Sequence, residues 1–180
     1  AVVGIIMKLF KHWPAALYVF YLCLMAPAVL ACDAILDLKS SPGLVERGML
    51  GDPNEYVQRV YSGAAVSFST LVFPSQEMPN KKKLLRDTVQ NMVSTVASRN
   101  KNSKPQAQVL NEELLPQLDT RLAFLTYIQY GREGSMNVEA AGLIKNESCW
   151  SIVRFTALKK QTRDEGLNQF ANLIRSTILD

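Results

Sequence analysis

The chain has 180 residues, of which 48% are hydrophobic and 20% are charged. This composition is that of one ordinary globular domain, and it excludes a collagen-like chain, a disordered acidic tail and a polytopic membrane protein. The single histidine, His12, lies in a segment with the pattern of a cleavable leader. A mature protein that has lost His12 cannot use a Ser-His-Asp or Cys-His mechanism, nor can it bind a metal through histidine.

Residues 1–31 have the pattern of a secretory signal peptide that follows a few upstream residues. Two lysines near the start precede an apolar run over 13–25, and small residues follow as far as Ala31. An uncleaved membrane anchor is the alternative, because 13–31 approaches the length of about 20 residues that spans a bilayer. We therefore predict an exported, periplasmic bacterial protein.

Removal of this leader lowers the net charge. Lys8 and Lys11 are its only charged side chains, so the rest of the chain keeps 18 basic against 16 acidic residues, a net of +2. This excess is too small to indicate nucleic-acid binding, and we expect no nucleic-acid partner.

Two interpretations of the cysteines exclude one another. Val29-Leu30-Ala31-Cys32 resembles the lipobox of bacterial lipoproteins, in which Cys32 would carry the lipid and Asp33 would retain the protein at the inner membrane. In an oxidising compartment Cys32 can instead form a disulfide with Cys149. Two cysteines without histidine cannot form a structural zinc site, and we expect no metal and no cofactor.

The first part of the mature chain is predicted to be a tether followed by helices. Residues 32–51 have the composition of a tether, and 52–180 are expected to form a single α+β domain. Asp52-Pro53-Asn54-Glu55 resembles a helix start, followed by apolar residues at helical spacing as far as Ala64. The run 66–73 is compatible with helix or strand. A second helix is predicted from an Asn80 cap to about Arg99.

The sequence from residue 106 to residue 158 predicts a β-sheet. A short strand is possible over 106–110, and three extended runs over 121–130, 137–145 and 149–158 predict an antiparallel meander. A capping box formed by Thr162 and Glu165 then starts a helix expected over 163–179. The predicted fold is α+β, with N-terminal helices packed on a curved antiparallel β-meander and an extra C-terminal helix.

Two parts of this pattern resemble a known superfamily. They are the predicted helix opening Asp-Pro-x-Glu-Tyr-Val and the later run from Leu143-Ile144-Lys145 through a polar turn to Trp150-Ser151-Ile152. Together they resemble the nuclear-transport-factor-2-like (cystatin-like) superfamily over about 52–158, and most of all its small exported or lipid-anchored bacterial members. The resemblance implies a cone of sheet and helices that serves as a ligand pocket, an active site or an interaction module.

Three polar residues of the predicted meander are candidates for a pocket. Glu139 lies within the middle strand, and Tyr127 and Arg154 lie in the strands on either side, so all three are expected on one face of the sheet. They would then bind a small anion or polar ligand at the mouth of the cone. The structural alternative is a Glu139–Arg154 cross-strand pair on a solvated face, which is a common stabilising feature of sheets.

These observations favour a binding protein over an enzyme. The first hypothesis is an exported envelope domain that binds a small ligand or a protein partner without chemistry. The second is a histidine-free hydrolase or isomerase that uses the cone pocket, and the third is an immunity or inhibitor protein of an envelope-acting toxin. Contact of Lys81-Lys82-Lys83 with anionic lipid is expected only if a lipid on Cys32 attaches the domain to a membrane.

Overall fold

The computed structural model describes residues 33–51, 56–73, 79–99, 104–132, 135–145 and 149–179. Residues 32–180 form one compact unit. The expected leader, Cys32 and the helix start at 52–55 lie outside the described residues.

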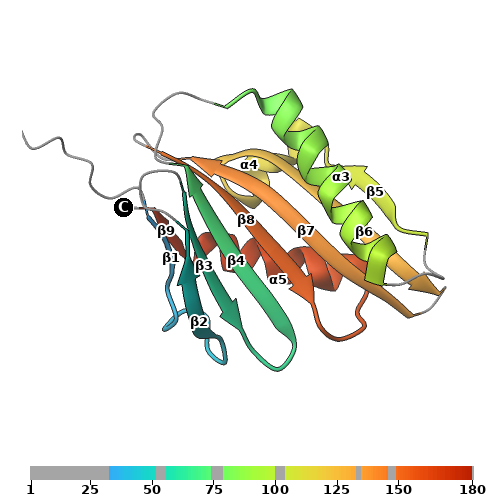
Figure 1. The fold of residues 1–180 in the computed structure, drawn as a ribbon, viewed down its shortest axis with the longest axis horizontal. Helices are drawn as coiled ribbons and strands as arrows, with labels where there is room; N and C mark the ends of the chain where they lie inside the picture. Colours follow the sequence, from blue (N-terminus) through green and yellow to red (C-terminus); the bar gives the residue numbers. More distant parts are fainter. Residues whose placement is uncertain are drawn as a thin grey trace, which may run out of the picture. The chain divides into compact units, whose positions relative to one another are not determined.

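The described residues form an antiparallel sheet flanked by helices (Figure 1). The seven-stranded sheet has the order β2-β3-β4-β8-β7-β6-β5, and β1 pairs with β9 in a separate two-stranded sheet. The elements are β1 (Ala34–Leu36), β2 (Val45–Leu50), β3 (Val57–Ser62), β4 (Val66–Phe73), α3 (Lys81–Arg99), β5 (Gln106–Val109), the 3-10 turn η2 (Glu112–Leu114), α4 (Leu115–Leu118), β6 (Leu122–Arg132), β7 (Ser135–Lys145), β8 (Trp150–Ala157), α5 (Arg163–Arg175) and β9 (Thr177–Leu179).

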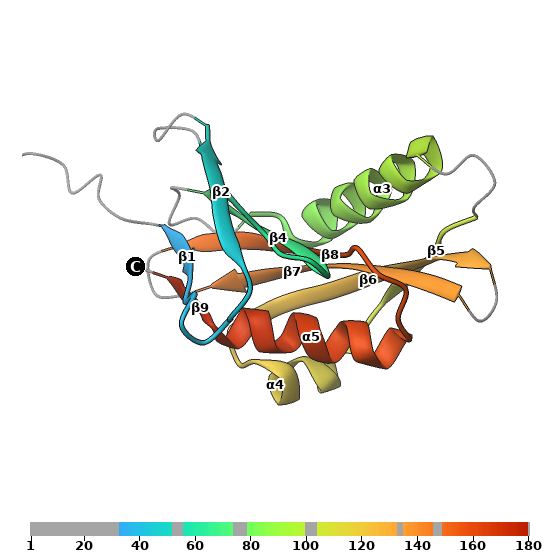
Figure 2. The ribbon, with the colours of Figure 1, turned by 90° about the horizontal axis from the view of Figure 1, so that it is seen from below.

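The helices lie on opposite faces of the large sheet: α3 covers one face, and α5 and α4 lie on the other (Figure 2). We call these the α3 face and the α5 face. Successive strand residues point to opposite faces, so the sheet has an apolar layer on both sides. In β6, for example, Ile128 packs with Met92 and Val96 of α3, whereas Leu125 belongs to the core under α5.

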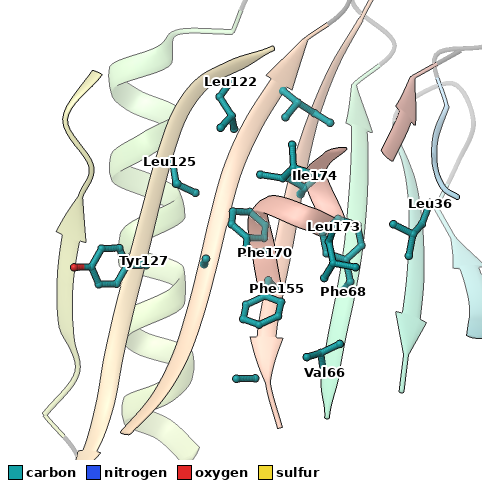
Figure 3. Packing of buried hydrophobic residues seen from close by; sticks show 14 of the residues in the cluster. Leu36, Val66, Phe68, Leu122, Leu125, Tyr127, Phe155, Phe170, Leu173 and Ile174 are labelled. Carbon is teal, nitrogen blue, oxygen red and sulfur yellow. The ribbon is translucent and has the colours of Figure 1, made fainter. Parts of the chain in front are cut away.

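The largest apolar core lies between the sheet and α5 (Figure 3). The ring of Phe170 from α5 lies 5.9 Å from Phe155 of β8 and 6.5 Å from Phe68 of β4, measured between centroids, and all three side chains are buried. Gly166 allows the helix to approach β7, because a Cβ at this position would lie 2.9 Å from Cβ of Val138. The amphipathic C-terminal helix predicted from sequence is therefore the main cover of the α5 face.

The helix expected from residue 52 to residue 64 is wrong in its described part. Val57–Ser62 is strand β3, and it forms a hairpin with β4 in which Tyr61 pairs with Phe68. The spacing of Val57, Val60 and Tyr61 suits a helix. In the structure, however, Tyr61 and Arg59 lie two residues apart on a strand and point to the α5 face. Their cross-strand partners there are Phe68 and Thr70. Cross-strand packing therefore overrides the helical pattern.

The expected tether 32–51 is also corrected, since described residues 33–51 contain two strands. β1 pairs with β9, and β2 pairs with β3 at the edge of the large sheet. The Arg59 guanidinium forms ion pairs with Asp33 and Glu46, so one side chain of β3 anchors both strands. The order "helices first, sheet after" is wrong, because the first four described elements are strands.

Other parts of the prediction are confirmed. The fold class is α+β, α3 starts after Asn80, whose side chain accepts from the backbone N–H of Lys83, and β6, β7 and β8 form the expected meander. The short strand β5 is present, and the ambiguous run 66–73 is strand β4. The Thr162–Glu165 capping box starts α5, but this helix ends at Arg175 instead of reaching 179, because the chain then turns into β9.

Gly166→Ala tests the close approach of α5 to β7. Alanine favours a helix interior by about 1 kcal/mol over glycine, but its methyl group must displace Val138, and such overpacking costs about 1–3 kcal/mol. We expect a net loss of unfolding free energy in urea denaturation. Gly48→Ala is the control, because a Cβ at residue 48 meets nothing within 4 Å. An unchanged or higher stability of the Gly166→Ala variant would contradict the described packing.

Candidate functional site

The structure places the three predicted pocket residues on two different faces. β7 lies between β6 and β8 as expected, and Glu139 and Arg154 share the α3 face, because their partners in the register are Thr156 and Ala141. Tyr127 pairs with Ala140, the neighbour of Glu139, so it points to the α5 face. There it is buried, and its hydroxyl donates to Oε1 of Gln108 on β5 (Figure 3). The expectation that all three residues line one face is therefore wrong.

A different tyrosine accompanies Glu139. The Tyr130 hydroxyl donates to Oε1 of Glu139 across 3.4 Å, and both residues are buried. Tyr130 packs with Met92 and Val96 of α3. Sequence reasoning missed Tyr130, although a tyrosine three residues from Tyr127 must point to the opposite face of a regular strand. The alternation of the two tyrosines is visible in the sequence, but only the β6–β7 register shows which of them shares a face with Glu139.

Burial dominates the electrostatics of this cluster. The Glu139 side chain is 4% exposed, and this desolvation raises its pKa, while Arg154, Arg99 and the hydrogen bond from Tyr130 act in the opposite direction. Burial, together with the Glu139 charge, raises the pKa of Tyr130 to about 12. Among the described residues no ion pair within 4.0 Å joins Glu139 to Arg154, so the expected cross-strand salt bridge is not formed.

Cys149 is buried directly before β8, and it is disulfide-bonded. Cys32, its expected partner, lies outside the described residues, as does the lipobox that precedes it. The Cys32–Cys149 pairing therefore stays a prediction.

A separate pocket of about 300 Å³ lies where β6 begins, β7 ends and β8 begins. Its apolar part comes mainly from α4 and the start of β6, and its polar part comes from α3, η2, the turn before β6 and the end of β7. The lining residues are Lys81, Glu112, Leu115, Pro116, Thr120, Leu122, Ala123, Lys145 and Trp150. Glu139 is not among them.

Two ammonium groups and one indole set the chemistry of this pocket. Lys145 Nζ lies 5.9 Å from the centroid of the Trp150 ring, a cation–π distance. Lys81 Nζ lies 2.5 Å from Oε1 of Glu112, and this contact lowers the pKa of the Glu112 carboxyl. Sequence reasoning had considered Lys81 as part of a solvated helix end or of a contact with anionic lipid, and it had given Lys145 no role, because these residues come together only through the strand order.

The described residues show neither a metal-ligand group nor a membrane-spanning helix. They contain no group of three histidine, cysteine or acidic side chains arranged to hold a metal ion. None of their helices has both the length and the apolar character needed to cross a bilayer.

Comparison with known proteins gave no relative: no family model, no curated protein and no solved structure matches this chain. The resemblance to the nuclear-transport-factor-2-like superfamily therefore stays a prediction. Of the two parts that carried it, the strands β7 and β8 are present and pair with each other, and the helix is replaced in its described part by β3.

The raised pKa of Glu139 predicts a specific pH dependence of stability. The folded protein binds this proton more tightly than the unfolded chain does, so the stabilisation is complete below the ordinary carboxyl pKa and is lost as the pH rises through the raised value. Between about pH 4 and about pH 7 the wild type should therefore lose stability relative to Glu139→Gln, by roughly 1.4 kcal/mol for each unit of pKa elevation.

Urea denaturation at both pH values measures this difference. Glu113→Gln, on the exposed turn η2, is the control for loss of one carboxyl from the net charge. A stability difference between wild type and Glu139→Gln that is the same at both pH values would refute the environment described for Glu139.

Proposed function

We propose that this chain is an exported protein of the bacterial envelope whose α+β domain binds a small ligand without chemistry. The observation that carries the proposal is the pocket beside Trp150, which combines an indole, an apolar wall and two ammonium groups. Small-ligand sites typically combine apolar walls with a few polar groups that fix orientation, and about 300 Å³ is at the small end of their volumes.

The acid–base groups of the domain support binding over catalysis. Glu112, the one carboxylate among the pocket-lining residues, is paired with Lys81, and the buried Glu139 lies outside the pocket. A general acid or base must come within hydrogen-bond distance of its substrate, and Glu139 is buried, with 4% of its surface exposed.

Export is supported by the leader pattern together with the disulfide of Cys149, because disulfides persist mainly in oxidising compartments. Cys23 would be removed with the leader, so Cys32 is the cysteine that remains to pair with Cys149.

Pairing of Cys32 with Cys149 and lipidation of Cys32 are mutually exclusive, so this proposal commits to ordinary signal cleavage. The intact mass of the protein recovered from the envelope without reductant tests it. We expect a chain that begins at Cys32 and is lighter by a pair of hydrogens, a deficit that reductant removes. A lipid-sized addition on Cys32 would refute the disulfide and would establish a membrane-anchored lipoprotein.

Ligand-detected NMR tests the binding function. We expect the full chain to bind members of a set of single-ring compounds of different charge, and Thr120→Trp should abolish binding, because an indole at this exposed lining position fills the pocket. Asn91→Trp, on the exposed side of α3, is the control. Binding that survives Thr120→Trp, or no binding by any compound, would contradict the proposal.

A histidine-free hydrolase or isomerase is the second candidate, because Glu139 is buried and its pKa is raised, as is typical of catalytic carboxyls. In this alternative α3 would move to admit a substrate to Glu139 and Tyr130. Loss of a measured activity in Glu139→Gln, with folding intact, would favour it over simple binding.

A further inference from the structure

The charge arrangement of the pocket beside Trp150 indicates which ligands it accepts. We infer that it takes a small organic anion with a flat apolar body, held by Lys145 and by Lys81 after Lys81 exchanges its bond to Glu112 for a bond to the ligand. This inference rests on the proposed function and names the ligand class for that site.

Lys145 is the first anchor. Its ammonium lies over the Trp150 ring at the end of β7, and no carboxylate of the described residues lies within 4.0 Å of it. An anion beside Lys145 would therefore gain a partner without breaking an existing ion pair. The Trp150 ring fixes where the ammonium lies, which reduces the ordering cost of binding.

Lys81 is the second anchor, and Glu112 is its internal competitor. The Glu112 side chain is 76% exposed, so its bond to Lys81 is of the weak surface type, and the released carboxylate returns to water. Lys81 is also the first residue of the 19-residue helix α3, whose N-terminal dipole adds positive potential at the same place. Both lysines and the helix end thus favour negative charge, and among the described lining residues Glu112 is the one carboxylate that offsets them.

The walls of the pocket select the body of the ligand. Leu115, Pro116, Leu122 and Ala123 provide the aliphatic part of the lining. A volume of about 300 Å³ accommodates a single ring with one charged group and little more. Benzoate, benzamide and benzamidinium have nearly the same shape and carry negative, zero and positive charge, so they isolate the contribution of charge.

Tryptophan fluorescence measures binding directly at the site. The chain has two tryptophans, Trp13 and Trp150, so the full chain with Trp13→Phe reports on Trp150 alone. We expect benzoate to change this fluorescence at concentrations at which benzamide and benzamidinium do not, and we expect its affinity to fall as salt concentration rises.

Three variants with calorimetric readout test the two anchors. Lys145→Met should weaken benzoate binding at least about fivefold, and Glu112→Gln should strengthen it by about twofold to fivefold, since surface ion pairs have energies of this order. Lys83→Met is the control, because Lys83 pairs with Asp87 outside the pocket and its loss changes the net charge equally. Its benzoate affinity should stay close to that of the parent.

The contrary outcomes are distinct. If all three probes bind equally in a way that changes Trp150 fluorescence, the charge inference is wrong and the proposed small-ligand function stands. If no probe binds, the proposed function is wrong as well. Weakening by Lys83→Met as large as that by Lys145→Met, or weakening by Glu112→Gln, would overturn the assignment of the two anchors.

Discussion

The contact between α5 and β7 is the constraint on which much of this fold depends. Gly166 brings the helix onto Val138, and Phe170 lies over Gly142, where a Cβ would be 2.9 Å from Leu122 and 3.6 Å from the Phe170 ring. A side chain at Gly166 would push helix and sheet apart, and one at Gly142 would displace Leu122 beneath the helix. At this distance Phe170 reaches the rings of both β4 and β8, so the contact joins the two halves of the sheet.

The position of α5 also determines where the first described residues, Asp33 and strand β1, lie in the fold. Arg121, before β6, is held by Asp119 and donates to the carbonyl oxygen of Ile174, an acceptor that α5 itself leaves unpaired, and to that of Thr177 at the start of β9. The chain then enters β9, which pairs with β1. Asp33 in turn binds Arg59, so the placement of the residue after Cys32 follows from packing at the other end of the chain.

The sequence predicted those parts of the molecule in which local signals agree with tertiary structure. Asn80 and the Thr162–Glu165 box mark helix starts by side-chain capping, and the extended runs of the sequence mark the three strands of the meander. β3 was not predictable in the same way, because the spacing of Val57, Val60 and Tyr61 suits a helix, and cross-strand contacts with β4 make this segment a strand instead. The site depends even more on topology. In the observed β6–β7 register Tyr130 lies on the same face as Glu139, whereas a shift of one residue would place Tyr127 there instead. The pocket combines residues of separate elements that no local sequence pattern relates.

The pairing of β1 with β9 has a mechanical consequence. Ala34 pairs with Leu179, so the beginning of one strand and the end of the other lie side by side. A force that pulls these two ends apart acts across the strands, so the hydrogen bonds of the pair break one after another instead of sharing the load. On the β9 side the strand should therefore peel away at low force until the load reaches the packed helix α5, whereas on the β1 side the load first meets the ion pair of Asp33 with Arg59, which precedes the strand.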